Sequence, residues 1–259
     1  MDLGIRGRQA IVCASSQGLG KACALALAQA GVSVIINGRS LELLEQTAAE
    51  IRDASSVQVI PVVADLLTTD GVDALLAECP APDILINNNG GPPYKDFREL
   101  DRAALLTGLT MNMLTPIELI RRVIDGMAER CFGRIVNITS SSVKMPLPGL
   151  ELSSGARAGL TAFVAGVART VADRNVTINN LLPGYFDTAR MRSGLGRAAK
   201  LENRTEEEIA ARSVEAIPAR RFGTPHEFGA VCTFLCSQQA GYMTGQNILL
   251  DGGLYPGAF

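Results

Sequence analysis

Short apolar runs alternate with amphipathic helical patterns along most of this 259-residue sequence, and this alternation limits the possible folds more than any other feature. The runs are mostly apolar on both faces, as expected for strands in a sheet that helices cover on each side. The expected strands span residues 9–14, 32–37, 57–63, 84–87, 134–139, 177–182 and 247–251. The expected helices span residues 18–30, 41–53, 71–79, 96–129, 153–173 and 225–236. Repeated strand–helix–strand units predict an α/β fold with a parallel sheet.

The chain is long enough to bury one sizeable core, and no segment rich in Pro, Gly or Ser divides it. We therefore expect a single domain over residues 1–259. Its least regular part is 187–221, where arginines and glutamates cluster around Gly194 and Gly196. This segment is interpreted either as a mobile lid over a substrate or as a solvated helix pair on the surface.

The composition excludes several classes of function. A formal net charge of −2 argues against nucleic-acid binding, which usually requires a net-basic surface. The single histidine, His226, excludes a zinc site built from several histidines, and we expect no metal. The six cysteines form no Cys-x-x-Cys pair, which favours free thiols in a reducing compartment. Without a basic-then-apolar start or a run of about 18 apolar residues, the sequence predicts a cytoplasmic protein with no membrane span.

A glycine-containing turn follows the first expected strand and opens the first expected helix. Gly18 and Gly20 let the backbone approach a diphosphate closely, and the N–H groups that begin the following helix attract anions. Glycines also mark ordinary tight turns, but their place between a strand and a helix favours a dinucleotide site.

The end of the second expected strand indicates which dinucleotide binds. An NAD site generally offers a carboxylate there, whereas this chain has Arg39 and Ser40. A guanidinium and a hydroxyl suit a 2′-phosphate through charge-assisted hydrogen bonds, so the sequence favours NADPH over NADH. The alternative is that Arg39 is a surface residue and that Ser40 only caps the next helix.

Several motifs in one order resemble the short-chain dehydrogenase/reductase family over essentially the whole chain. Residues 13–20 resemble its Thr-Gly-x-x-x-Gly-x-Gly turn, with Cys and Ala as the first two members. Further matches are an Asp-Leu pair at 65–66, Asn-Asn-Asn-Gly at 87–90, a Pro-Gly-x-x-x-Thr element at 183–188, and the segments 221–227 and 251–253. Within the family, the sequence is most similar to 3-oxoacyl-carrier-protein reductases and to sugar or polyol dehydrogenases.

This resemblance implies a doubly wound, Rossmann-type sheet of seven parallel strands in the order 3-2-1-4-5-6-7, with helices on both faces. It implies a small-molecule substrate at the carboxyl ends of the strands and a homotetramer built from the long central helices and the C-terminal helix and strand. The cofactor is then NADP (NADPH), with NAD disfavoured. The residues expected to contact it are Ala14, Ser15, Ser16, Gln17, Gly18, Leu19, Gly20, Arg39, Ser40, Asp65, Leu66, Asn88, Asn89, Gly90, Arg157, Pro183, Gly184 and Thr188.

The catalytic residues of the family match this chain only in part. Asn112 matches its Asn on the fourth helix, and Ser140 matches its Ser after the fifth strand. Thirteen residues after Ser140, where the family has Tyr, stands Ser153, and four residues further on Arg157 takes the place of Lys. Spaced four apart on a helix, Ser153 and Arg157 share one face. We therefore expect Asn112, Ser140, Ser153 and Arg157 to form an atypical catalytic group.

The two replacements change the proton chemistry. An aliphatic hydroxyl is a far weaker acid than a phenol, whose pKa is about 10. A guanidinium with a pKa above about 12 stays protonated, so Arg157 is expected to hold or polarise an oxygen and not to relay a proton. Substitute acids are not identifiable from the sequence: Tyr185 and Tyr94 are candidates near the cleft, as is Lys144, and each also suits an ordinary structural role.

Two hypotheses follow. The first is an oxidoreductase that uses NADPH to reduce a carbonyl, or oxidises an alcohol, on a 3-oxoacyl or sugar and polyol type of substrate, with an atypical proton donor. The second is a catalytically silent NADP-binding protein that acts as a sensor or as the non-catalytic subunit of an active reductase. Three arginines of the charged segment, Arg190, Arg192 and Arg197, suggest a carboxylate or phosphate on the substrate.

Overall fold

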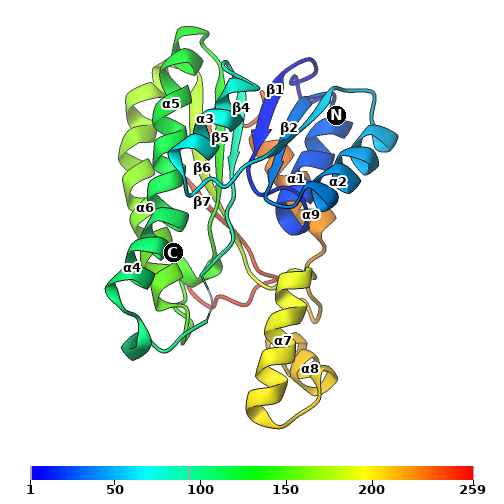
Figure 1. Ribbon diagram of the computed structural model, residues 1–259, viewed down its shortest axis with the longest axis vertical. Coiled ribbons are helices and arrows are strands. Elements are labelled where there is room, and N and C mark those ends of the chain that lie inside the picture. The colour runs from blue at the N-terminus through cyan, green and yellow to red at the C-terminus, as the bar shows by residue number, and fades with distance from the viewer. Residues whose placement is uncertain (1, 93, 259) are drawn as a thin grey trace.

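A parallel sheet of seven strands forms the centre of the computed structural model, which describes residues 2–92 and 94–258 (Figure 1). The strands lie in the order β3-β2-β1-β4-β5-β6-β7, and every neighbouring pair is parallel, so the predicted Rossmann-type topology is confirmed. The strand bounds are β1 Gln9–Val12, β2 Ser33–Gly38, β3 Val59–Val63, β4 Ile84–Asn87, β5 Gly133–Ile138, β6 Val176–Pro183 and β7 Asn247–Leu250.

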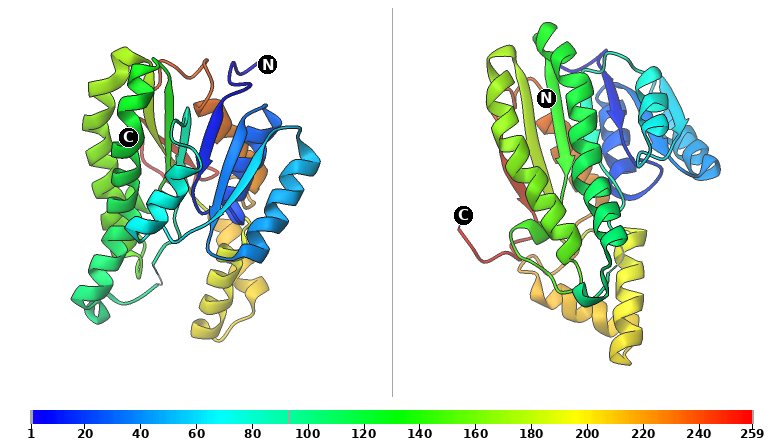
Figure 2. Two further views of the ribbon diagram at one scale, coloured as in Figure 1. Left: turned by 45° about the horizontal axis from the view of Figure 1, so that its top comes forward. Right: turned by 60° about the vertical axis from the view of Figure 1, so that its left-hand side comes forward.

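Helices cover both faces of the sheet, because successive strand residues point to opposite sides and both sides are apolar. Val12 of β1 belongs to one buried cluster and its neighbour Ile11 to the other. The first cluster is completed by α1 (Gly18–Gln29), α2 (Leu41–Ala54) and α9 (Pro225–Leu235). The second is completed by α3 (Thr69–Ala77), α5 (Thr115–Glu129) and α6 (Glu151–Val171) (Figure 2).

The long helix expected over 96–129 is interrupted, which corrects the sequence prediction. The Asp96 carboxylate accepts the Arg98 amide and caps a short 3-10 turn. The Asp101 carboxylate then accepts the Ala104 amide at 2.7 Å and starts α4 at Arg102–Leu109. Because aspartates favour helix starts over helix interiors, this pair breaks the apolar periodicity that predicted one helix.

A π-helical turn at Thr110–Leu114 joins α4 to α5 and contains the predicted site residue Asn112. Such turns insert an extra residue into a helix and are frequent at functional sites. The turn buries the Asn112 side chain, whose amide donates to the Gly108 carbonyl at 3.5 Å.

Two helices form within 187–221, as one of the two interpretations of this segment expected. They are α7 (Ala189–Glu202) and α8 (Glu206–Ala216), which project beyond one end of the sheet (Figure 1). Thr205 and Glu208 form a capping box at the start of α8, with each side chain accepting the other residue's amide. Of the two interpretations of this segment, the helix pair describes its structure.

A row of asparagine side chains crosses four neighbouring strands. Asn87 of β4 donates to Asn137 of β5 at 2.8 Å, Asn137 donates to Asn180 of β6 at 3.0 Å, and Asn180 donates to Asn247 of β7 at 2.8 Å. The four residues are direct register partners in the parallel sheet. Three amides of this asparagine row therefore each satisfy the side-chain carbonyl beside them, whereas the Asn87 side-chain oxygen is buried without a partner among the described residues.

One helical stretch among the described residues, Arg102–Glu129, is long and apolar enough by length and composition to cross a membrane. A helix that packs along a sheet passes the same test, and Leu119, Val123 and Met127 of this stretch are buried in the second cluster. The length and composition of this stretch are therefore weak evidence for a membrane span.

Candidate active site

Two adjoining cavities open at the carboxyl ends of the strands. The first, which we call the switch-point cleft, has a volume of about 460 Å³ and lies where the strand order reverses between β1 and β4. Ligands of open α/β sheets bind at this kind of position. The second, the α7 cavity, has a volume of about 440 Å³ and is bounded by β5, β6, α6 and α7. Leu19, Asn88, Thr188 and Arg190 line both, so the cleft and the cavity are continuous.

The glycine turn shapes the floor of the switch-point cleft. Gly18 has φ +60°, a left-handed conformation that glycine adopts without strain. A Cβ on Gly20 would lie 2.5 Å from the Ala14 carbonyl oxygen, so only glycine lets α1 begin this close to β1. Within the described residues, no side chain caps the start of α1, which leaves its amides available to an anion. This cradle fits a dinucleotide diphosphate.

Arg39 lines the far end of the cleft, as a contact to a 2′-phosphate requires. The Ser40 hydroxyl instead accepts the Leu43 amide at 3.5 Å and caps α2, as the alternative interpretation of that residue expected. The opposite wall carries Asp65, whose carboxylate also accepts the Leu67 amide at 3.1 Å.

Most of the predicted cofactor residues line one of the two cavities. The switch-point cleft is lined by Ala14, Ser16, Gln17, Gly18, Leu19, Arg39, Asp65, Leu66, Asn88, Asn89, Gly90 and Thr188. The α7 cavity is lined by Arg157, Pro183 and Gly184. Three predicted residues, Ser15, Gly20 and Ser40, line neither cavity. Ser15 is buried, where it donates to the Val12 carbonyl at 2.7 Å and ties the turn to β1.

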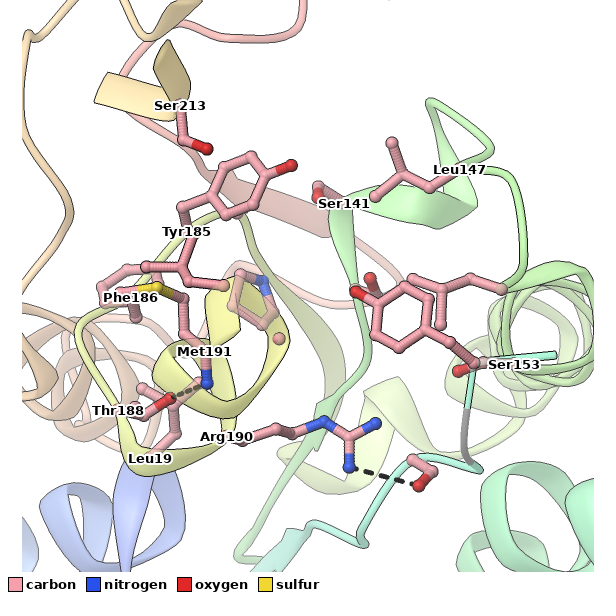
Figure 3. Close-up of a pocket in the computed structure, with 18 of the residues that line it drawn as sticks. Leu19, Ser141, Leu147, Ser153, Tyr185, Phe186, Thr188, Arg190, Met191 and Ser213 are labelled. Atoms are coloured by element: carbon pink, nitrogen blue, oxygen red, sulfur yellow. Dashed lines mark hydrogen bonds between the residues drawn. The ribbon is translucent and has the colours of Figure 1, made fainter. Parts of the chain in front are cut away.

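Three of the four predicted catalytic residues meet in the α7 cavity. Ser140 follows β5, whereas Ser153 and Arg157 lie one turn apart on α6 (Figure 3 labels Ser153). Asn112 does not reach this cavity. It borders a void of about 10 Å³, close to the volume of a single water, which Arg157 also lines.

The Arg157 guanidinium is held by two hydrogen bonds. Its Nε donates to the Ser153 hydroxyl oxygen at 3.2 Å, and a terminal nitrogen donates to the Ile138 carbonyl at 2.7 Å. Burial, and secondly the positive charge of Arg190, lower the pKa of Arg157 to about 10. The expectation of a pKa above about 12 is therefore wrong, because it ignored desolvation of the cation. At neutral pH the side chain is still protonated.

The hydroxyl oxygens of Ser140 and Ser153 both act as hydrogen-bond acceptors within the protein. Ser140 Oγ accepts the Ser142 amide at 3.1 Å, and Ser153 Oγ accepts Arg157 Nε–H. A hydroxyl that accepts on its oxygen remains able to donate its own proton. Both serines line the α7 cavity, so each can donate a hydrogen bond to a group bound there.

The other acid candidates take varied positions. Tyr185 and Tyr94 both line the α7 cavity, and the Tyr185 ring reaches into it in Figure 3. Burial raises the pKa of Tyr185, with a smaller contribution from Tyr94, so this phenol is less acidic than usual. Lys144 lies 5.5 Å from the centre of the Tyr255 ring, and His226 is exposed at the start of α9.

Sequence reasoning missed some residues of the site and misplaced one. Arg212 of α8 lines the α7 cavity, but two interpretations of its segment stayed open and so no face could be assigned. Asn37 lines the cleft and accepts the Ala14 amide at 3.2 Å, and its position at the end of β2 was the available signal. Of the three arginines expected near a substrate, Arg190 and Arg197 line the cavity, whereas Arg192 forms an exposed ion pair with Asp187.

Comparison with known proteins identifies the family of this chain. The family described as enoyl-(acyl carrier protein) reductase matches residues 13–255. Nodulation protein G of Rhizobium sp. (strain N33) is 35% identical, over 96% of this chain and 98% of that protein. A 3-oxoacyl-(acyl-carrier-protein) reductase of Aquifex aeolicus is 32% identical, over 98% of this chain and all of that protein, 100%.

Among solved structures, L-sorbose reductase from Gluconobacter frateurii, complexed with NADPH and L-sorbose, superposes with a TM-score of 0.93. It is 27% identical, and the match covers 99% of this chain and 100% of that one. With a matching family pattern over nearly the whole chain, relatives above 30% identity and the same sheet order, this chain belongs to the short-chain dehydrogenase/reductase family of oxidoreductases.

Proposed function

We propose that this protein uses NADPH to reduce the carbonyl group of a small molecule, or oxidises the corresponding alcohol. The observation that carries this proposal is that the switch-point cleft opens into the α7 cavity. A cofactor in the cleft would therefore lie beside a substrate in the cavity, where the Ser153–Arg157 pair forms part of the wall. The proposed substrate is of the 3-oxoacyl or the sugar and polyol type, the classes named for the Aquifex aeolicus reductase and for L-sorbose reductase.

The proposed cofactor supplies a hydride to the substrate carbon, and the cleft supplies the residues to hold it. The turn at Gly18 and the uncapped start of α1 bind the diphosphate. The Arg39 guanidinium pairs with the 2′-phosphate, which NAD lacks. Thr188 and Pro183 lie where the cleft enters the cavity and border the reactive end.

The proposed proton donor is the Ser153–Arg157 pair acting together. Ser140 and Ser153 donate hydrogen bonds to the substrate oxygen and stabilise the negative charge that develops on it. The Ser153 proton then moves to that oxygen while the Arg157 Nε proton moves to Ser153 Oγ, and the neutral guanidine regains a proton from solvent. A pKa of about 10 for Arg157 makes this transfer comparable in driving force to one from an ordinary phenol.

Asn112 is proposed to act as a positioning residue. Its Oδ1 is buried without a partner among the described residues, and it borders the same small void as Arg157. Through a single bridging water, this oxygen would fix the orientation of the guanidinium.

The test is NADPH oxidation by purified protein over a panel of ketones, oxoacyl thioesters and sugar-derived carbonyl compounds. For an accepted substrate, Ser153→Ala should lower kcat by about 10²- to 10³-fold with a small change in KM, as expected when one donor to a developing oxyanion is lost. Ser154→Ala is the matched control, because Ser154 is buried on the same helix outside the cavity walls.

The silent NADP-binding alternative predicts a different result. NADPH would bind, no compound of the panel would be reduced, and the double change Ser153→Tyr with Arg157→Lys would create activity that the wild type lacks. Turnover by the wild type that Ser153→Ala abolishes would exclude this alternative.

We further propose that residues 187–221 close over the substrate as a lid, that 1–259 act as one domain, and that four copies assemble in the cytoplasm. The lid proposal is supported by α7, which lines both cavities. Assembly is supported by apolar side chains on the outer faces of α4 and α6, where Leu106 is 52% and Phe163 44% exposed.

A further inference from the structure

The walls of the α7 cavity carry positive charge without matching negative charge. Its charged side chains, among the residues that the structure describes, are four arginines and no aspartate or glutamate. They come from three helices: Arg157 from α6, Arg190 and Arg197 from α7, and Arg212 from α8.

Only one of the four arginines is neutralised by a carboxylate. Arg212 forms two 2.6 Å hydrogen bonds with Glu202. Arg157 donates to Ser153 and to the Ile138 carbonyl, both neutral groups. Arg190 donates to the carbonyls of Gly91 and Pro92, and Arg197 to the carbonyl of Tyr94, with no carboxylate partner for either within residues 2–92 and 94–258. Three positive charges therefore face one cavity, and their field favours an anion there.

The two arginines of α7 flank a glycine of the cavity wall. Arg190, Gly194 and Arg197 lie on one face of the helix at the spacing i, i+4 and i+7, and all three line the cavity. A Cβ built on Gly194 would meet nothing within 4 Å, so no other side chain fills the space directly beside this residue of the cavity wall. Figure 3 shows Arg190 extending into the cavity.

Arg197 is oriented to accept an anion. Its guanidinium lies 4.2 Å from the centre of the Tyr94 ring, and one of its five N–H donors is used on the Tyr94 carbonyl. Stacking on an aromatic ring leaves the edge donors of a guanidinium free. The cavity also has apolar wall residues, which include Met145, Leu147, Leu150, Leu195 and Leu254, beside polar ones such as Ser140, Ser141 and Ser213.

We infer that the substrate is a small anionic carbonyl compound, with its acid group between Arg190 and Arg197, its apolar body against the leucines, and its carbonyl at Ser140 and Ser153. This inference rests on the proposed function and narrows its substrate class. The reaction is then oxo acid plus NADPH plus a proton giving hydroxy acid plus NADP⁺. A volume of about 440 Å³ suits such a small molecule.

The deciding experiment compares an aliphatic oxo acid with its methyl ester, which has the same carbonyl and lacks the charge. The acid should show a kcat/KM higher by about 10- to 100-fold, as charge-assisted hydrogen bonds of this kind contribute. Because Arg190 and Arg197 are solvent-exposed, the preference should decrease at high salt. Equal or better reduction of the ester would overturn the inference.

Variants identify the residues responsible. Arg197→Gln should raise KM for the acid by about tenfold or more and leave the ester unchanged, and Arg197→Lys should restore part of the preference. Arg197 is the residue to change because it lines only the α7 cavity, whereas Arg190 also lines the switch-point cleft, where a change could affect cofactor binding. Arg192→Gln is the matched control, since Arg192 pairs with Asp187 outside the cavity. Unchanged discrimination in Arg197→Gln would contradict the assignment.

Two further measurements complete the test. One identifies the acid group of the substrate, and the other distinguishes failure of this inference from failure of the proposed function. An oxo phosphate preferred over the oxo acid would keep an anionic substrate and identify phosphate, whereas a coenzyme A thioester preferred over both would overturn a charge inside the cavity. If no compound is reduced, the proposed function fails. Calorimetry with the NADP⁺-loaded protein then still tests this inference, which requires that a hydroxy acid bind more tightly than its methyl ester.

Discussion

In the proposed mechanism, the Ser153 hydroxyl depends on its neighbour for acidity. Its oxygen accepts Arg157 Nε–H at 3.2 Å, so the cation can withdraw electron density from the hydroxyl and supply a replacement proton. We propose that these two side chains, which share one turn of α6, take the place of the Tyr and Lys of the family.

The pH dependence of activity should show the ionisation of Arg157. Reduction requires the protonated guanidinium, so kcat/KM should be level around neutral pH and fall as the pH rises through about 10. Tyr185→Phe should keep the same decline, because that phenol is not the donor. Circular dichroism at each pH would verify that the protein is folded, and a profile that Tyr185→Phe abolishes would assign the donor to Tyr185.

Cofactor choice should depend on Arg39. Arg39→Ala should raise KM for NADPH by about 10- to 100-fold and leave KM for NADH nearly unchanged, because the lost hydrogen bonds involve only the 2′-phosphate. Initial rates with both cofactors measure this. Arg98→Ala serves as the control, since Arg98 is exposed beside Asp96, outside the cleft walls. A parallel loss for both cofactors would show that Arg39 does not contact the phosphate.

At the level of single residues, the sequence predicted position better than chemistry. The resemblance to the family placed Ser140, Ser153 and Arg157 at one site, and all three line the same cavity. It could not give the pKa of Arg157, which depends on burial by distant segments. Nor could it decide between phosphate contact and capping for Ser40.

Among the secondary-structure elements, α1 and α9 make the closest helix contact around a glycine. A Cβ on Gly229 of α9 would lie 2.5 Å from the Ala22 carbonyl oxygen of α1. The two helices can therefore pack on the sheet side by side only because this side chain is missing.

Two glycine substitutions should have opposite effects on stability. Gly229→Ala should lower the free energy of unfolding by about 1–3 kcal/mol, since backbone must move to admit the methyl group. Gly166→Ala in α6 should raise it by about 0.5–1 kcal/mol, because nothing lies within 4 Å of the added Cβ and alanine favours helix. Urea denaturation measures both. Equal changes in the two variants would contradict the packing described for α9.

The elements that the sequence predicted well are those with strong local periodicity, namely the seven strands and the helices between them. It missed the break before α4, since Asp101 acts as a cap only when its side chain turns back to the Ala104 amide. It left α7 and α8 as one of two interpretations of residues 187–221, because the charges and the glycines at 194 and 196 suit an exposed loop as well as a helix pair.

For the whole molecule, α4 and α6 leave apolar side chains exposed. Leu105 and Leu106 of α4 and Phe163 of α6 are each more than two fifths exposed, at 41%, 52% and 44%. Exposed apolar side chains are frequent at protein–protein interfaces, and we propose that these three contribute to one.

Assembly should therefore depend on this surface. Leu106→Glu combined with Phe163→Glu should convert the proposed tetramer to smaller species, because both charges would be buried unpaired at the interface. Light scattering after size exclusion measures the mass. Leu41→Glu is the matched control, an equally drastic change at a 60% exposed leucine on α2, on the other side of the sheet. A monomeric wild type would refute the tetramer itself.

The asparagine row has a consequence for how this sheet assembles. A shift of one residue that sets Asn137 opposite Leu181 leaves its side-chain amide without an amide partner on β6, whereas the shift in the other direction sets it opposite Asn179. Burying a side-chain amide without a hydrogen-bond partner costs about 1–3 kcal/mol of stability. The row therefore favours the observed alignment of β5 with β6 over the shift toward Leu181, and the adjacent Asn179 makes the opposite shift less costly.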